Sequence, residues 1–394
     1  MKSLGRQTEA RGFAGLSVVE GVSGEGSAAP RPLAPARWDW SRIRSVLVVR
    51  LRSLGDTVLA TPSLHALRRF LPGARIDVLL EDWVAPLLEG SEDVDRVLTV
   101  RRKSQSSRLR VARQLRAEGY DVAYNLHGGS TAALLVRASG AAHRVGYADY
   151  AYAALHNHAA PPSAELWGME KTHSAEQQLA LLGWTGVPVN DRPASRLAVM
   201  HAAAAVVEQR LKDEAGLAPG QPFALIHPAA AFDTKTWAAA NFARVVEHLA
   251  ARGLASVAVA APGEEKVVDK VRVQSSAPLH GFTDLSLPEL TALAARANIF
   301  VGNDSGVAHV AAAVRTPQVV VFGSSNVAHW RPWTAAPAEV VREEMHCAPC
   351  PGYICAEFGT PECIRRVPAE RVVAAVERVL TAVEKSGVRS QGSE

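Results

Sequence analysis

Short apolar runs alternate along most of the chain with stretches in which apolar residues recur at helical spacing. Apolar runs of roughly four to eight residues predict buried strands, and recurrence every three to four residues predicts helices. Helical patterns cover ranges such as 57–71 and 108–118. A first series of candidate strands lies at 45–51, 75–80, 94–100, 120–126 and 143–147, and a second at 223–227, 255–261, 298–302 and 317–322. This alternation predicts right-handed crossovers and parallel sheets, and hence an α/β fold.

The two series of strands predict two Rossmann-like domains. A Pro-containing stretch at 185–195 and a helical pattern near 197–214 separate them, which places the domains at 42–195 and 196–385. Ligands of such sheets bind beyond the carboxyl ends of the strands. We therefore expect the two parallel sheets to face a central cleft that holds the active site.

The two ends of the chain have a different character. Residues 1–41 are rich in Gly, Ala, Ser and Pro with little periodicity, which predicts a disordered extension. They also lack the compact apolar core of a secretory signal, so we do not expect export. At the other end, a helix that starts near Pro368 is expected to finish at about Lys385, followed by a flexible tail at 386–394.

Composition is consistent with an enzyme and narrows the function little. The 394 residues suffice for two domains of ordinary size. Lys and Arg exceed Asp and Glu by 43 − 39 = 4, so net charge favours no particular partner. No apolar run reaches the roughly 18–20 residues that a membrane span needs. The four cysteines all lie between 347 and 363, which fits a reducing compartment better than a disulfide framework.

The most informative segment is Gly302-Asn303-Asp304-Ser305-Gly306, which follows an apolar strand and opens a helix. The free N–H groups of a helix start attract an anion, and Asp304 or Ser305 could cap the helix. A carboxylate beside a phosphate suits a phosphorylated sugar better than a bare phosphate, because the carboxylate accepts hydrogen bonds from hydroxyl groups. The alternative is a capped helix in an ordinary α/β sheet.

Two further residues follow strand ends, where catalytic groups of such folds collect. Asp56 follows Ser53-Leu54-Gly55 directly before a helix, and it could be no more than a helix cap. Lys235 lies in Asp233-Thr234-Lys235-Thr236-Trp237 after the second series begins. A lysine there could neutralise negative charge on a bound phosphate group, or it could be a solvated surface residue.

Three more residues are candidates for binding a nucleotide or the sugar attached to it. Glu264 or Glu265 follows the strand at 255–261 and could hold the ribose or base of a nucleotide, although either could be an exposed glutamate of a first helical turn. His309 lies one helical turn past Ser305 and either joins the site or only packs. We interpret His227 and Trp237 as structural.

Four segments resemble glycosyltransferase family 9, the ADP-heptose:lipopolysaccharide heptosyltransferases. They are residues 46–79 with Ser-Leu-Gly-Asp, residues 225–249 with Lys-Thr-Trp, the stretch Gly263-Glu264-Glu265, and residues 299–333 with Gly-Asn-Asp-Ser-Gly. The resemblance runs from about Ser45 to about Leu380. It implies a GT-B fold and inverting transfer of a heptose-type sugar from a nucleotide diphosphate, ADP-heptose above all, to a lipopolysaccharide core or related glycan.

The resemblance also implies roles for single residues. Asp56 matches the family's proposed general base, and Lys235 matches a lysine that contacts the donor. Asp304, Ser305 and Gly306 would bind the sugar and its diphosphate, and no cofactor would be needed for catalysis. One alternative is a nucleotide-sugar 2-epimerase of the same fold, and another is a non-catalytic sugar-nucleotide-binding protein.

A basic run between 101 and 116 holds seven Arg or Lys residues and no acidic residue. Such a run is often a solvated helix face, but it could also bind the phosphates or carboxylates of a lipid-linked glycan and an anionic membrane surface. Nucleic acid is not expected, because no recognised reading module accompanies the run. The candidate acceptor-binding residues are Arg52, Arg101, Arg102 and Lys103. The resemblance places the enzyme in the cytoplasm, with peripheral contact at the inner membrane.

The cysteines form a metal-like cluster in a predicted loop at 346–363. Four thiolates in one loop could close a tetrahedral zinc site or hold an iron–sulfur cluster, and of these two metals structural zinc is the preferred one. The spacing departs from the two-knuckle zinc pattern, so reduced thiols without a metal remain the alternative. The candidate ligands are Cys347, Cys350, Cys355 and Cys363.

Overall fold

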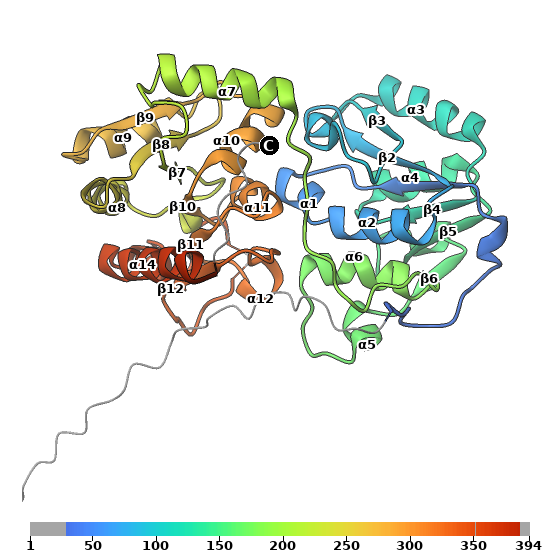
Figure 1. Cartoon of the computed structure of the whole chain (residues 1–394). Coiled ribbons are helices and arrows are strands. Elements are labelled where there is room, and N and C mark those ends of the chain that lie inside the picture. The colour runs from blue at the N-terminus through green and yellow to red at the C-terminus, as the bar shows by residue number, and fades with distance from the viewer. Residues whose placement is uncertain (1–28, 351, 387–394) are drawn as a thin grey trace, which may run out of the picture.

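Two six-stranded parallel sheets form the framework of the chain, whose computed structural model describes residues 29–350 and 352–386 (Figure 1). In the N-terminal domain the strand order is β3-β2-β1-β4-β5-β6. Every pair of neighbouring strands in this sheet is parallel. The strands are β1 (Ser45–Val49), β2 (Arg75–Glu81), β3 (Arg96–Val100), β4 (Val122–Asn125), β5 (His143–Tyr147) and β6 (His158–Ala160).

The C-terminal domain repeats this topology. Its strand order is β12-β11-β10-β7-β8-β9, which is the same winding with the first strand again next to the fourth. All of its strand pairs are parallel as well. The predicted α/β class with two Rossmann-like sheets is confirmed. The strands are β7 (Phe223–His227), β8 (Ala255–Val259), β9 (Leu279–Phe282), β10 (Ile299–Asn303), β11 (Gln318–Phe322) and β12 (Ala338–Arg342).

Helices cover both faces of each sheet, because successive strand residues turn to opposite sides and both sides are apolar. Val46 and Val48 of β1 pack with α2 and α6, whereas Leu47 and Val49 pack with α3 and α4. The N-terminal helices are α1 (Leu54–Val58), α2 (Thr61–Phe70), α3 (Gln105–Glu118), α4 (Ser130–Ser139), α5 (Ser163–Trp167) and α6 (Ser174–Gly183), with single turns η1 (Trp40–Arg42), η2 (Ala85–Leu88) and η3 (Ala153–Leu155).

In the C-terminal domain, α8 and α14 cover one face of the sheet, and α7, α10 and α11 cover the other. The helix expected from Pro368 to Lys385 is α14. Among the described helices, none is both long and apolar enough to cross a membrane. The C-terminal helices are α7 (His201–Asp213), α8 (Ala239–Ala251), α9 (Glu265–Gln274), α10 (Leu287–Arg296), α11 (Gly306–Ala313), α12 (Val327–Trp330), α13 (Glu362–Arg365) and α14 (Ala369–Ser386), with the single turn η4 (Asp233–Lys235).

Sequence analysis missed three strands and joined two helices. The missed strands β6, β9 and β12 lie at or next to sheet edges, where only one or two of their residues are buried, so no continuous apolar run marks them. The helical pattern at 57–71 is divided between α1 and α2, with a break at Leu59-Ala60 just before the first turn that contains Pro62.

The expectation of disorder up to residue 41 is wrong for residues 29–41. Leu33 and Ala34 donate backbone hydrogen bonds to Gly183 at the end of α6, and Trp40 donates its indole N–H to the carbonyl of Thr185. Trp38 stacks on His143 at 4.3 Å between ring centroids. The two tryptophans cover the edge of the first sheet, a contact that composition does not reveal. The rest of the predicted extension, 1–28, and the tail at 387–394 lie outside the described residues.

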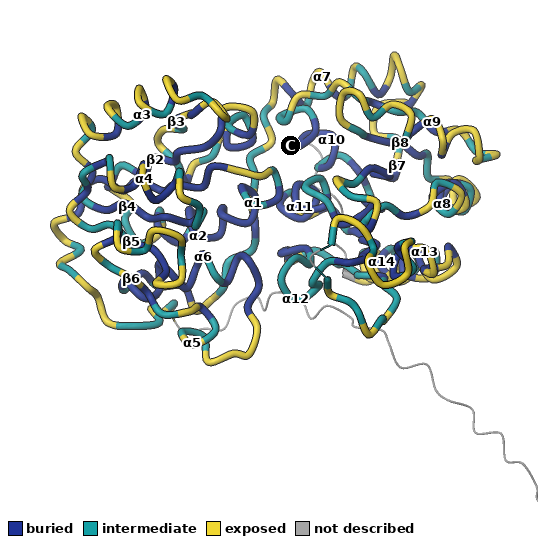
Figure 2. The backbone as a smooth tube through the Cα atoms, turned by 180° about the vertical axis from the view of Figure 1, so that it is seen from behind, coloured by how far each residue is buried: buried dark blue, intermediate teal, exposed yellow. Residues whose placement is uncertain are grey.

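The two domains meet through α1 and α11, which lie side by side in the middle of the molecule in both the front and the rear view (Figures 1 and 2). The approach is close because glycines stand where the helices touch: a Cβ at Gly55 would lie 2.7 Å from the His309 ring, and one at Gly306 would lie 2.8 Å from Leu54. Val58 and Leu87 of the N-terminal domain also belong to the apolar cluster of the C-terminal domain. The interface is thus partly a shared hydrophobic core.

Candidate active site

The candidate residues gather where the strand order of each sheet reverses, beyond the carboxyl ends of the strands. Ligands of doubly wound sheets bind at this place, because two neighbouring crossovers leave it in opposite directions. Asp56 follows β1 and His127 follows β4, the two strands at the reversal point of the first sheet. Lys235 follows β7 and Asp304 follows β10 in the second sheet. The contact between α1 and α11 brings the two halves together.

Asp56 lies at the start of α1 with both carboxylate oxygens engaged. Arg50 donates from Nη2 to Oδ1, and the backbone N–H and hydroxyl of Ser53 donate to Oδ2 at 3.0 Å each. Burial alone would raise the pKa of Asp56, but the charge of Arg50, the Ser53 bonds and nearby His309 bring this pKa below its usual range. Asp56 is therefore ionised at neutral pH, as a proton acceptor must be. Asp56 also completes a capping box with Ser53, the N-cap of α1, so the capping alternative is confirmed and the catalytic role stays a prediction.

Arg50 and His127 hold Asp56 in place, and sequence analysis missed both. Arg50 is 8% exposed, and its Nε donates to the carbonyl oxygen of Asp56 at 3.4 Å. Its Nη1 lies 3.3 Å from Nδ1 of His127. A signal was present, since an arginine that directly follows a fully buried strand must find buried partners.

In the C-terminal domain, Lys235 donates to Oδ2 of Asp304 at 2.8 Å. Asn303, also missed from the sequence, supports this pair. Its side chain accepts the backbone N–H of Trp237 at 3.1 Å and donates to the carbonyl of Pro228 at 2.8 Å. Asn303 thus joins the loop that carries Lys235 to the strand that carries Asp304.

The start of α11 presents two buried polar atoms that have no hydrogen-bond partner among the described residues: Oγ of Ser305 and Nδ1 of His309. Buried polar groups in native proteins are nearly always paired, so these two atoms at the start of α11 are candidates for contact with a ligand. Burial lowers the pKa of His309, against the opposing charges of Asp304 and Asp56. His309 is therefore neutral at neutral pH and lies between the acidic residues of the two domains.

Glu264 and Glu265 both serve the turn before α9. Oε2 of Glu264 accepts the N–H of Ala261 at 3.0 Å, and Oε1 of Glu265 accepts the N–H of Gly263 at 2.8 Å. Glu265 is exposed, whereas Glu264 is half-buried and its charge reaches buried His227. Glu264 is thus the more buried of the two glutamates, and the role of either in nucleotide binding stays a prediction.

His227 and Trp237 have structural contacts, as interpreted from the sequence. Nδ1 of His227 bonds the carbonyl of Val259 at 2.9 Å. The indole N–H of Trp237 donates to the carbonyl of Val367 at 2.8 Å, and its ring is buried in the C-terminal core. Both side chains join elements of the second domain to one another.

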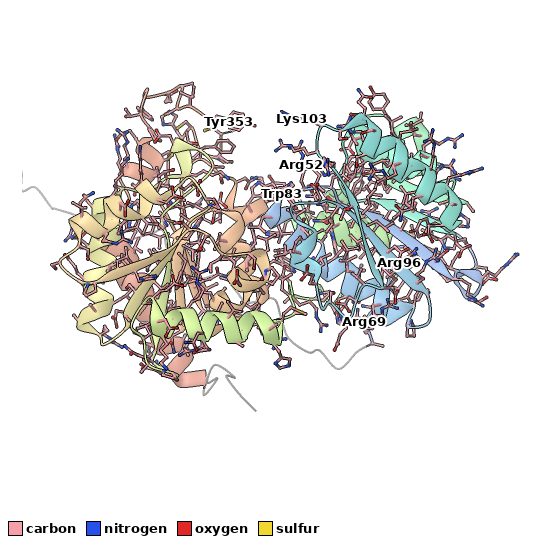
Figure 3. The ribbon with its side chains drawn as sticks, turned by 90° about the horizontal axis from the view of Figure 1, so that it is seen from above. Arg52, Arg69, Trp83, Arg96, Lys103 and Tyr353 are labelled. Carbon is pink, nitrogen blue, oxygen red and sulfur yellow. The ribbon has the colours of Figure 1, made fainter. Side chains whose placement is uncertain are left out.

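The candidate acceptor residues line one cavity of about 230 Å³ in the N-terminal domain. Figure 3 shows Arg52 and Lys103 on the side of this domain that faces the other domain. The only acidic residue of the lining, Glu81, lies 3.8 Å from Arg52 and 4.0 Å from Arg102. The cavity therefore keeps an excess of positive charge. Its lining comprises Leu51, Arg52, Glu81, Val100, Arg101, Arg102, Lys103, Arg108, His127, Gly129, Ser130 and Thr131.

The basic run divides between this cavity and solvent. Arg101, Arg102, Lys103 and Arg108 line the cavity, whereas Arg110, Arg113 and Arg116 are exposed on α3. The solvated-face reading therefore fits Arg110, Arg113 and Arg116, and the binding reading stays a prediction for the four residues that line the cavity.

The cysteine segment contacts the loop that carries Lys235 through backbone hydrogen bonds. Thr234, next to Lys235, donates its hydroxyl to the carbonyl of Gly352 at 3.1 Å, and the N–H of Cys350 donates to the carbonyl of Ser324 at 2.9 Å. Tyr353 packs edge-on against Phe232 with the ring centroids 4.4 Å apart. Figure 3 shows Tyr353 on the C-terminal domain, across from Arg52 and Trp83 of the N-terminal domain.

The predicted four-thiolate metal site is not assembled in this structure. All four cysteines are free, and over 29–350 and 352–386 no group of three or more His, Cys, Asp or Glu side chains could hold a metal ion. Burial raises the pKa of Cys363, and the thiols of Cys350, Cys347 and Cys355 raise it further. The thiols are thus neighbours, but backbone contacts rather than a shared ligand set fix the loop.

Comparison with known proteins agrees with this geometry. A family model described as glycosyltransferase family 9 (heptosyltransferase) matches residues 108–359. Lipopolysaccharide heptosyltransferase 3 of Escherichia coli is 30% identical over 303 residues, which cover 72% of this chain and 85% of that protein.

Two solved structures share the fold. The structure of E. coli ADP-heptose lps heptosyltransferase II aligns with a TM-score of 0.72 and 22% identity, covering 86% of this chain and 99% of that one. The iron-containing dodecameric glycosyltransferase TibC of enterotoxigenic E. coli aligns with a TM-score of 0.52 and 16% identity, covering 91% and 81%. These likenesses confirm the expected GT-B fold. Together with the family match over most of its length, they establish that the chain belongs to glycosyltransferase family 9.

Proposed function

We propose that this glycosyltransferase transfers a heptose-type sugar from a nucleotide diphosphate, ADP-heptose in the first place, to a lipopolysaccharide core or related glycan. The names of its relatives support this substrate class. The observation that carries the proposal concerns the two sides of the interface between α1 and α11. On one side the Asp56 carboxylate is held by hydrogen bonds, and on the other Ser305 Oγ and His309 Nδ1 have no partner among the described residues. A base on one side and an incomplete polar site on the other are what transfer between two bound sugars requires.

In the proposed reaction Asp56 takes the proton of the acceptor hydroxyl as that oxygen bonds to the anomeric carbon. The bond from the anomeric carbon to the donor diphosphate breaks on the opposite face, so configuration inverts. Asp56 suits this role because its low pKa keeps it ionised and because His309 of α11, in the other domain, is near enough to act on its charge. Neither step calls for a metal, so we propose that catalysis needs no cofactor.

The C-terminal domain would hold the donor. Lys235 and the backbone N–H groups of Ser305 and Gly306 would stabilise the leaving diphosphate. Oδ1 of Asp304 would accept hydroxyl groups of the sugar, while Oδ2 stays bonded to Lys235. His309 would contact the sugar from the domain interface. We assign the ribose or base to Glu264 rather than Glu265, because Glu264 is the half-buried one.

The basic cavity would receive the acceptor. Arg52, Arg101, Arg102 and Lys103 offer an excess of positive charge beside the Asp56 segment, and His127 belongs both to the cavity lining and to the contacts of Arg50. Guanidinium groups bind phosphate and carboxylate oxygens in a fixed fork geometry. An anionic glycan would therefore be anchored within reach of the base.

Neutralising the cavity should weaken acceptor binding alone. We expect a variant with Arg101, Arg102 and Lys103 changed to Gln to raise the acceptor KM and leave donor binding unchanged. The wild type should lose acceptor affinity with salt more steeply than this variant, since the Debye length falls from about 30 Å at 0.01 M to about 8 Å at 0.15 M. Steady-state kinetics across a salt series measures both effects.

The outer face of α3 supplies a matched control of equal charge. Changing Arg110, Arg113 and Arg116 to Gln removes three charges that do not line the cavity. Equal salt dependence in all three proteins would contradict an acceptor role for the cavity.

We further propose that the enzyme works in the cytoplasm with peripheral contact at the inner membrane. Trp83 is 46% exposed near the basic cavity, and Tyr353 and Ile354 are 66% and 79% exposed on the other domain. Exposed aromatic residues with nearby basic ones favour an anionic membrane surface. The two sets of Gln variants also test this proposal. Less of the cavity variant than of the wild type should sediment with anionic vesicles. If the wild type bound neutral and anionic vesicles equally well, the charge argument would be refuted.

A structural metal at the cysteine segment is the remaining part of the proposal. The neighbouring thiols support it, and the relative TibC is iron-containing by name. Binding would require the thiolates to converge further than they do here. We expect anaerobically purified protein to carry about one zinc per chain, and a Cys363→Ser variant to lose it. Elemental analysis that finds neither zinc nor iron in the wild type would refute the site.

The transfer itself is tested by incubating the enzyme with ADP-heptose and lipid-linked core acceptors and following both substrates. Transfer to the glycan supports the proposal. Interconversion of the free donor without an acceptor would instead support a nucleotide-sugar epimerase. Binding of the donor without either reaction would support a non-catalytic protein.

A further inference from the structure

The guanidinium group of Arg50 is a buried partner of Asp56. It leaves the end of β1 almost fully buried and uses all three of its nitrogens: Nη2 on Oδ1 of Asp56, Nε on the carbonyl oxygen of the same residue, and Nη1 toward Nδ1 of His127. An arginine that contacts both the side chain and the backbone of one residue fixes the orientation of that residue. No other cation pairs with Asp56 among the described residues.

His127 completes this arrangement from the neighbouring strand. Burial and the charge of Arg50 lower the pKa of His127 to about 4, against the opposing charge of Asp56. The imidazole is therefore neutral at neutral pH, and its Nδ1 can accept from Nη1 of Arg50. His127 thus holds Arg50, and Arg50 holds Asp56.

We propose that Arg50 is a positioning residue, which orients the Asp56 carboxylate toward the acceptor and keeps it ionised. His127 holds the Arg50 guanidinium in place. The inference rests on the proposed role of Asp56 as the base. With Oδ1 held by Arg50 and Oδ2 by Ser53, the plane of the carboxylate is fixed before the acceptor binds. Such preorganisation matters because a misplaced base loses much of its rate advantage.

The other groups around Asp56 do not replace Arg50. Ser53 contributes hydrogen bonds without charge. His309 approaches from α11 and is kept neutral by burial. His329 of α12 and His127 also feel the charge of Asp56, and burial lowers the pKa of both. Among the described residues, Arg50 is therefore the one permanent positive charge that acts on Asp56.

The test compares Arg50→Lys, Arg50→Met and, as a control, Arg137→Met, which removes an exposed arginine of the same domain. Arg50→Lys keeps the charge and loses the fork, so kcat should fall at least tenfold while the acid limb of the pH profile stays in place. Arg50→Met should lower kcat further and move the acid limb up by about one to three pH units, the usual effect of removing an opposite charge. Donor KM should stay within a few-fold in both.

A ¹³C NMR titration of the Asp56 carboxylate gives a readout that does not need the reaction. It should report a higher pKa for Asp56 in Arg50→Met than in Arg50→Lys or the wild type, with added guanidinium chloride restoring part of the difference. Should Arg50→Met not fold, full turnover in Arg50→Lys would by itself overturn the proposal. A folded Arg50→Met protein with an unmoved Asp56 titration would overturn it too. If the titration shifts but no transfer is found, the assigned reaction fails and the link between Arg50 and Asp56 stands.

Discussion

Replacing Asp56 by Asn should lower turnover by about 10²–10⁴, the usual contribution of a general base, while donor affinity stays within a few-fold. The amide keeps the size of the carboxylate, and its oxygen can still accept from Ser53. Its NH2 group then faces the buried guanidinium of Arg50, which loses its counter-charge, so Tm is measured alongside turnover to separate this effect from catalysis. The amide cannot take a proton from the acceptor hydroxyl. Single-turnover transfer and a separate donor-binding titration measure the two quantities independently.

The control for Asp56→Asn is Asp95→Asn. Asp95 lies in the same domain, accepts from Arg68 at 2.5 Å and from the backbone N–H of Ile76, and directly precedes β3, whereas the candidate residues follow the carboxyl ends of strands. Its loss also removes an ion pair with an arginine, although a more exposed one, and it should leave turnover near normal. Near-normal turnover in Asp56→Asn as well would reduce Asp56 to the helix cap that its position also allows.

The parts of the fold that the sequence predicts are those with strong local signals. Central strands such as β1 and β7 are buried on both faces and therefore appear as continuous apolar runs. Edge strands bury one face at most, so β6 and β12 carry no such run. The segment 29–41 was misjudged for another reason. Its order comes from Trp38 and Trp40, which contact residues distant in the sequence. The average composition of a segment does not reveal the contacts of single residues.

The candidate site shows the same limit. Strand ends and small-residue turns point to Asp56, Lys235 and the start of α11, because parallel sheets collect ligands there. The residues that orient them were missed, since Arg50 and Asn303 act on partners that only folding brings near. The basic run could not be divided from sequence either. Which of its arginines line the cavity depends on where β3 ends and α3 begins.

The ion pair between Lys235 and Asp304 calls for a test that separates catalysis from stability. Asp304 is 5% exposed and Lys235 is its only ion-pair partner within the described residues. Removing the lysine leaves a buried carboxylate without compensation, which destabilises a protein. A Lys235→Met variant that is less active could therefore be damaged in either way.

A double-mutant cycle of Lys235→Met, Asp304→Asn and the double variant resolves this, because Asp304→Asn alone measures how much turnover is lost with the carboxylate. Lys235→Met should slow transfer by about 10²–10³, the usual loss when a preorganised group no longer meets charge that develops in the transition state, and should weaken donor binding and lower Tm. In the double variant Lys235→Met, Asp304→Asn the carboxylate is neutral, so Tm should recover, because no unpaired charge remains buried. Turnover should not recover, because no cation faces the departing diphosphate. Thermal unfolding, donor titration and single-turnover rates follow the three effects separately. A double variant that regained turnover together with Tm would show that Lys235 serves the fold and not the donor.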